Sequence, residues 1–179
     1  MRDLFCIRCF VNKIKNLETL ANGSMVILAI VAAAVLIRAE FFPASSQKHA
    51  LRAGDRLAVE NVDWRTHRAT LVLALQVGCR FCSESAPFYS KVAAALEQSD
   101  VHVVAVFPQT TELALKYLGR LRVPIGDVRE QLLSTMNVFG TPTIILVDRN
   151  GRIVRTWIGK LNEEGEAEVI STALALRQG

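Results

Sequence analysis

The chain has 179 residues, of which 51% are hydrophobic, and a net charge of +4. This length predicts one domain with an appendage, and the hydrophobic content is high enough to indicate a membrane segment as well as a core. The 21 basic residues are dispersed among 17 acidic ones, and the absence of a long run of like charge argues against nucleic-acid binding.

The first element along the chain is an apolar run at residues 25–37, which Arg38 ends. The run is shorter than the roughly 20 residues that cross a bilayer, but snorkelling polar side chains and flanking aromatic rings can extend it. We predict an uncleaved membrane anchor at residues 24–42, preceded by a cytoplasmic segment at residues 1–23. A cleaved signal peptide and a buried helix are the alternatives.

The four cysteines form two pairs, Cys6 with Cys9 and Cys79 with Cys82. A shared zinc site would require the pairs to meet, but far more chain separates them than the about 15–20 residues of ribbon-type sites. We therefore predict no metal at the second pair. For the first pair, a metal site shared across a dimer, acylation near the membrane and reduced thiols without a role remain open.

A linker is predicted at residues 43–50, because a proline and small polar residues occur there without periodicity. The folded domain is expected at residues 51–179, which is a normal size for a single domain. It opens with short apolar alternation at Leu57, Val59 and Val62, which predicts a strand or hairpin.

A buried strand and the second pair of cysteines come next. Residues 69–77 are apolar except for Gln76, as in a strand that is buried on both faces. Gly78 ends this run where a helix can begin. A thiol at a helix N-terminus faces unpaired N–H groups, which favour the thiolate. Cys79 is therefore the predicted nucleophile, and Cys82, one turn later, is the cysteine that closes the disulfide.

The rest of the domain alternates helices and strands. The remaining predicted elements are a helix to residue 98, a strand at residues 101–107, a helix at residues 111–121, a hairpin at residues 143–158 and a helix at residues 162–176. Thr110 is the predicted cap of the second helix. Asp127 with Glu130 resembles an acidic capping box, which predicts a further helix to about residue 136. His67 is expected in a surface turn, and His102 in the sheet as a structural residue.

Two stretches resemble the thioredoxin-like superfamily. Residues 71–87 contain the two cysteines, followed by Pro87 at the position where that superfamily kinks its active-site helix. Residues 139–143, with the sequence Phe-Gly-Thr-Pro-Thr, resemble its cis-proline loop, which packs beside the cysteines and receives the substrate backbone. The resemblance covers residues 51–179.

The resemblance implies a thioredoxin-like α/β fold, in which helices flank a central mixed sheet, and thiol-disulfide exchange without a cofactor. It implies that Cys79 and Cys82 are catalytic and that Thr141 and Pro142 bind the substrate backbone. The insertion at residues 110–136, expected to be helical, resembles the membrane-anchored extracytoplasmic proteins of the TlpA and ResA kind more than plain thioredoxin.

Several positions depart from the family pattern. Gly78 replaces the usual tryptophan, Ser85 stands where a glutamate is common, and Leu73 stands where thioredoxin has a buried acid. No residue can therefore be assigned to the proton transfer that activates Cys82.

Two side chains between the cysteines are candidates for tuning and binding. We hypothesise that Arg80 stabilises the Cys79 thiolate and makes the disulfide more oxidising; the alternative is that it faces solvent or an acidic partner. Phe81 is predicted to contact the substrate chain rather than the core. Pro87 is predicted to shape the active-site helix.

The predicted function is a thiol-disulfide oxidoreductase with its catalytic domain on the periplasmic side of the membrane. The resemblance implies reduction of disulfides in exported proteins, as in cytochrome c maturation, with electrons from a membrane donor. An oxidase or isomerase is the nearest alternative. A thiol peroxidase, in which threonine or serine would replace Gln76, and a non-catalytic binding module are the others.

Overall fold

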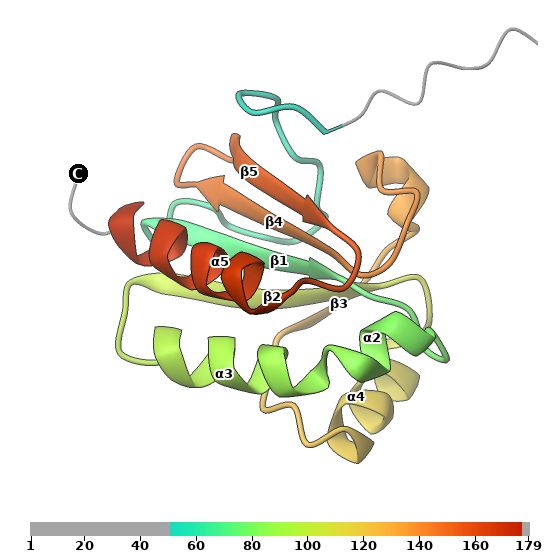
Figure 1. Ribbon diagram of the computed structural model, residues 1–179. Coiled ribbons are helices and arrows are strands. Elements are labelled where there is room, and N and C mark those ends of the chain that lie inside the picture. The colour runs from blue at the N-terminus through green and yellow to red at the C-terminus, as the bar shows by residue number, and fades with distance from the viewer. Residues whose placement is uncertain (1–50, 177–179) are drawn as a thin grey trace, which may run out of the picture. The chain divides into compact units, whose positions relative to one another are not determined.

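The structure of this protein, a computed structural model, describes residues 51–176 (Figure 1). The predicted anchor, the linker, Cys6 and Cys9 lie outside the described residues and stay predictions. Within residues 51–176, no helix combines the length and the apolar composition that crossing a membrane requires.

The domain is built on a five-stranded mixed sheet in the order β3-β2-β1-β4-β5. The strands are β1 (Ala69–Ala74), β2 (Val101–Phe107), β3 (Val128–Glu130), β4 (Thr143–Asp148) and β5 (Ile153–Ile158). Strands β1, β2 and β3 are parallel, whereas β4 is antiparallel to both of its neighbours. The central mixed sheet that the sequence predicts is therefore confirmed.

Helices cover one face of this sheet. They are α2 (Arg80–Glu84), α3 (Ala86–Leu96), α4 (Thr111–Arg120) and α5 (Glu163–Ala175), and a short 3₁₀ helix, η1 (Leu133–Met136), lies between β3 and β4. Figure 1 shows α3 and α5 side by side on the same face. The opposite face packs against the segment before β1 and against η1.

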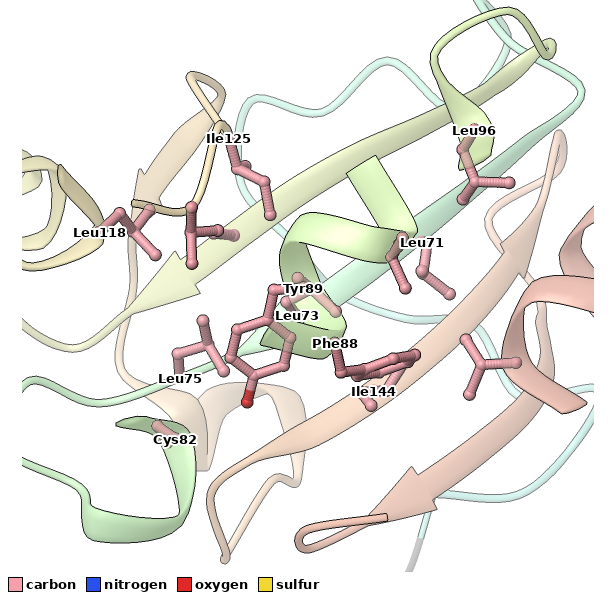
Figure 2. Close-up of a cluster of buried hydrophobic side chains, with 14 of the residues drawn as sticks. Leu71, Leu73, Leu75, Cys82, Phe88, Tyr89, Leu96, Leu118, Ile125 and Ile144 are labelled. Carbon is pink, nitrogen blue, oxygen red and sulfur yellow. The ribbon is translucent and has the colours of Figure 1, made fainter. Parts of the chain in front are cut away.

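Side chains of the central strand β1 pack on both faces of the sheet. Its side chains alternate, so that Leu71 and Leu73 join Phe88 and other residues of the helical layer (Figure 2), whereas Val72 lies in the cluster on the opposite face. All six residues of β1 are buried. Burial on both faces explains why its sequence is apolar throughout rather than alternating.

Several predicted elements are confirmed. Thr110 caps α4, because its hydroxyl accepts a hydrogen bond from the Leu113 N–H at 3.5 Å. Asn162 caps α5 in the same way through the Gly165 N–H, at 2.9 Å. The predicted hairpin is the antiparallel pair β4 and β5.

The helix predicted from the capping-box pattern at Asp127 is wrong. Residues 128–130 form β3, which pairs in parallel with β2, so the insertion before β4 is helical only in α4 and in the short η1. The Asp127 carboxylate accepts a hydrogen bond from His102 at 2.6 Å instead of capping a helix. Pairing with a distant strand outweighs a local capping signal, because it satisfies the same backbone groups and also buries Val128.

Three further details differ from the prediction. β1 ends at Ala74, before the end of the apolar run. The active-site helix is divided at Ser85 into α2 and α3, and Pro87 lies in the first turn of α3, where its missing N–H costs no hydrogen bond. The expected strand or hairpin before β1 is limited to a single bridge between Arg56 and Arg152.

The β4–β5 turn gives a stability prediction. Gly151 has φ +76°, and a Cβ added to it would lie 2.9 Å from Cδ1 of Trp64. We expect Gly151→Ala to lower the free energy of unfolding by about 1–3 kcal/mol, measured by chemical denaturation. Gly119→Ala in α4 is the matched control, because its Cβ would meet no atom within 4 Å and alanine favours a helix. Equal stabilities of the two variants would contradict this account.

Candidate active site

The geometry of the site begins with the turn that follows β1. Gly78 has φ +81°, a conformation that glycine adopts without strain and tryptophan does not. This turn places Cys79 as the N-cap of α2, where its sulfur accepts a hydrogen bond from the Cys82 N–H at 3.2 Å. The departure at Gly78 is therefore a backbone requirement of this turn.

The loop that carries Cys79 is held by a backbone carbonyl and by a glutamine side chain. The Cys79 N–H donates to the Gln76 carbonyl at 3.2 Å, and the Val77 N–H donates to the side-chain oxygen of Gln109 at 3.1 Å. The sequence analysis did not identify Gln109, which follows β2 and meets the loop only in the folded domain.

The second motif meets the first at the same sulfur. The Cys79 thiol donates to the Thr141 carbonyl at 3.5 Å, and the peptide bond between Thr141 and Pro142 is cis. The fold thus brings together two motifs that lie far apart in the sequence. Cys82 lies one turn from Cys79, is fully buried and is reduced in this structure.

The two cysteines differ in acidity. Partial burial acts to raise the pKa of Cys79, but hydrogen bonds from the Cys82 side chain and from backbone N–H groups outweigh it, so its pKa lies below the ordinary value. Burial, followed by the hydrogen bond to Cys79, raises the pKa of Cys82 to about 12. The accessible cysteine is therefore the one that ionises first, which is the asymmetry that a nucleophile and a resolving thiol need.

This asymmetry predicts selective alkylation. At pH 7 we expect iodoacetamide to modify Cys79 and to spare Cys82, because only the thiolate reacts. The rate at Cys79 should rise with pH and level off at a lower pH than in the urea-unfolded chain, since folding lowers the Cys79 pKa. Mass spectrometry of the digested chain would locate the label. Equal labelling of the two sites in the folded chain would contradict the prediction.

The Arg80 guanidinium is paired with an acidic side chain of its own helix. It is largely exposed and donates to Glu84 at 2.7 Å, and Glu84 also binds Lys160 at 2.9 Å. These two cations lower the pKa of Glu84, Lys160 first. The contacts that lower the pKa of Cys79 come from Cys82, Thr141 and backbone N–H groups, so tuning of the couple by Arg80 stays a prediction.

Ser83 and Tyr117 also contact Cys79, and the sequence analysis did not assign either of them to the site. Their hydroxyls lie 2.9 Å apart, and both donate to the Cys79 carbonyl, at 3.2 Å from Ser83 and 3.4 Å from Tyr117. Tyr117 lies on the buried side of α4 together with Ala114 and Leu118. This helical spacing predicts a core-facing tyrosine, whose hydroxyl then needs a partner, but the sequence does not identify that partner.

Exposed apolar side chains occur on three segments that adjoin the two motifs. Phe81, between the cysteines, is 53% exposed, Phe139 in the loop before Thr141 is 50% exposed and Ile158 at the end of β5 is 71% exposed. The contact between Lys160 and Glu84 joins the end of β5 to α2. We call Phe81, Phe139 and Ile158 the apolar rim.

The two histidines of the domain meet elsewhere. His67 stacks on His102 with ring centroids 4.9 Å apart, and their partners are Asp100 and Asp127 respectively. His102 lies near the start of β2, whereas Cys79 follows the end of β1, which runs parallel to β2. The histidines and Cys79 are therefore at opposite ends of these two strands. His67 lies in the bend before β1, as the sequence predicts, but its stacking on His102 was not predicted. In the part of the chain that the structure describes, no three His, Cys, Asp or Glu side chains are grouped to hold a metal ion.

Comparison with known proteins agrees with this geometry. The family model described as Redoxin matches residues 38–174, which include both motifs. The chain belongs to the redoxin family. It is 26% identical over 90 residues to a thiol-disulfide oxidoreductase ResA of Bacillus cereus and 24% identical over 90 residues to that of Bacillus anthracis. Each alignment covers 48% of this chain and 52% of the relative, so this redoxin spans about half the length of the curated relatives that it matches.

Solved structures share the fold. The thioredoxin domain of a thiol-disulfide oxidoreductase from Bacteroides vulgatus superposes with a TM-score of 0.57 at 20% identity, over 69% of this chain and 98% of that one. A thiol-disulfide isomerase from Corynebacterium glutamicum gives 0.53 at 19% identity, over 70% and 94%. The redoxin domain therefore has the thioredoxin-like fold that the two motifs imply.

Proposed function

We propose that this redoxin is a thiol-disulfide oxidoreductase whose reacting groups are Cys79 and Cys82. The observation that carries the proposal is the position of the Cys79 sulfur between the Cys82 N–H and the Thr141 carbonyl. A sulfur with a lowered pKa lies beside an internal resolving thiol and beside a backbone segment on which a partner chain can align. The redoxin family match and the names of the ResA relatives support the same chemistry.

The proposed reaction has two exchange steps. The Cys79 thiolate attacks a partner disulfide, forms a mixed disulfide and releases the first partner sulfur as a thiolate, which takes up a proton. Cys82 then loses its proton and attacks the Cys79 sulfur, so the bond from Cys79 to the partner breaks and the second partner sulfur leaves and is protonated. The partner gains two electrons and two protons, and Cys79 and Cys82 end as a disulfide.

The apolar rim gives the partner a place to bind. An extended segment laid along Thr141 and Pro142 would expose its side chains to Phe81, Phe139 and Ile158, which bury apolar area upon contact. A partner with apolar residues next to its disulfide therefore fits this surface better than a highly charged one. In this proposal Phe81 binds substrate, as the sequence predicts.

The direction and the location of the reaction belong to the same proposal. We infer reduction of disulfides in exported proteins, because the predicted anchor at residues 24–42 would hold the domain outside the cytoplasm, where disulfides persist. Such a reductant needs electrons from a membrane donor after every turnover. Reduction of apocytochrome c is one role of that kind, which the resemblance to the TlpA and ResA group implies.

Reduction of a protein disulfide tests the proposed activity. The purified full chain is expected to accelerate the reduction of insulin by dithiothreitol, followed as the turbidity of the released B chain, over dithiothreitol alone. The same preparation is assayed for peroxide consumption. No acceleration by a chain whose Cys79 is shown to be reduced would contradict the proposal, and rapid peroxide consumption would favour the thiol peroxidase instead.

A further inference from the structure

Two buried hydroxyl groups near the resolving cysteine have no hydrogen-bond partner. They are Oγ of Ser85 and Oη of Tyr89, in side chains that are 6% and 0% exposed. A buried hydroxyl without a partner costs free energy, and most buried polar groups in folded proteins are paired. This pair of hydroxyls therefore needs an explanation, which the contacts of the resting site do not provide.

The position of Ser85 adds to the anomaly. Ser85 is the N-cap of α3, where a serine hydroxyl usually accepts a hydrogen bond from a backbone N–H of the first turn. It makes no such bond here. Its carbonyl accepts from the Tyr89 N–H at 3.2 Å, so the two residues are one turn apart and their side chains lie on the same side of the helix. The Ser85 hydroxyl is thus directed inward, toward Tyr89.

Both residues lie next to the helix turn that contains Cys82, although neither hydroxyl is hydrogen-bonded to its sulfur in the resting site. Ser85 follows Cys82 by three residues, and the Tyr89 hydroxyl points toward α2, the helix that contains Cys82 (Figure 2). Burial raises the pKa of Tyr89 above its ordinary value, and the charge of Cys82 is the next cause. The Ser85 hydroxyl opposes this rise in pKa, although its geometry with Tyr89 is not that of a hydrogen bond. Tyr89 therefore stays a neutral phenol and keeps its hydroxyl proton.

We propose that Ser85 and Tyr89 are positioning residues for the resolving step, whose hydroxyls donate hydrogen bonds to the Cys82 sulfur when it becomes a thiolate. The inference rests on the proposed function and deepens it. It gives the redoxin a neutral pair of donors near a cysteine for which no acidic residue has been assigned a proton-transfer role. The proton that Cys82 releases is taken up by the departing partner thiolate.

The unpartnered state of the resting site follows from this role. A thiol is a weak acceptor, so the hydroxyls gain little from the Cys82 thiol. A thiolate is a strong acceptor, and hydrogen bonds to a charged group are about twice as strong as neutral ones. The two hydroxyls would thus stabilise the ionised Cys82 more than the protonated one. Stabilisation of the Cys82 thiolate accelerates the resolving step. This gain explains why two unpaired buried hydroxyls are kept although they lower the stability of the resting fold.

The inference is tested with the full chain and Ellman's reagent, 5,5′-dithiobis(2-nitrobenzoate). In stopped flow, the first release of thionitrobenzoate reports attack by Cys79, and the second reports resolution by Cys82. Tyr89→Phe is expected to slow the second release about tenfold and to move its pH midpoint upward, because one hydrogen bond to the thiolate is lost. The first release should keep its rate. The midpoint of urea unfolding should stay the same or rise, because a buried unpaired hydroxyl is removed.

Ser85→Ala is the second variant and is expected to act in the same direction, whereas Ser85→Thr, which keeps the hydroxyl, should retain fast resolution. An unchanged second release in both Tyr89→Phe and Ser85→Ala would overturn the inference. Slowing of both releases together would also overturn it, since that result indicates a general disturbance of the site. Absence of both releases in the unmodified chain would instead overturn the proposed function.

Discussion

Replacement of Cys82 by serine is expected to stop the reaction at a stable mixed disulfide, and replacement of Cys79 by serine is expected to prevent the reaction entirely. A serine hydroxyl is not ionised near neutral pH and does not exchange with a disulfide, whereas the Cys79 thiolate is favoured by the Cys82 N–H. Insulin reduction should be lost in both variants. Only the Cys82→Ser chain should retain a partner bound through Cys79.

Non-reducing electrophoresis and mass spectrometry after incubation with a disulfide-containing protein distinguish the two variants. The Cys82→Ser chain should yield a covalent adduct that dithiothreitol releases, and the Cys79→Ser chain should yield none at this site. Trapping by Cys79→Ser rather than by Cys82→Ser would reverse the roles of the two cysteines. It would also contradict the acidity difference between them, since Cys82 is the buried thiol with the raised pKa.

The second large effect concerns the strand beneath the site. Leu73 is fully buried in β1 and belongs to the same cluster as Cys82 and Tyr89 (Figure 2). Leu73→Ala removes apolar contacts and leaves a cavity, so we expect the free energy of unfolding to fall by about 2–5 kcal/mol. The matched control is Leu113→Ala in α4, where the leucine is 51% exposed. That change should alter the free energy of unfolding by less than about 0.5 kcal/mol.

Urea denaturation of reduced protein, followed by tryptophan fluorescence, measures both variants. Reduction matters because a disulfide between Cys79 and Cys82 would change the unfolded state as well as the folded one. Equal losses of stability in Leu73→Ala and Leu113→Ala would mean that β1 is not the centre of the core.

The sequence pattern predicts an element well where the element depends only on the residues of its own segment. The apolar run before Gly78 predicts the place of β1, although the strand ends at Ala74, and Thr110 caps the helix that it precedes, as predicted. The capping pattern at Asp127 misleads because β2 is available as a partner: the Ala105 N–H donates to the Asp127 carbonyl at 2.9 Å, which extends the sheet. That partner is distant in the sequence, and no local signal indicates it.

The residues of the candidate site also fall into those that a local motif predicts and those that it does not. Cys79, Cys82 and the Thr141 loop are recognisable because each motif is short and continuous in sequence. Gln109 and Tyr117 bond to Val77 and Cys79 from other parts of the fold, so their roles depend on tertiary contacts that spacing does not reveal.

The redox equilibrium of the Cys79 and Cys82 pair in glutathione buffers tests the central claim most directly. The account predicts reversible conversion between a dithiol and one internal disulfide, with two electrons exchanged, which mass spectrometry of the quenched and alkylated full chain would locate. A reduction potential near or below about −230 mV is expected for a reductant, and one near about −120 mV would indicate an oxidant. Formation of separate glutathione adducts on the two cysteines, with no internal disulfide at any potential, would contradict the account.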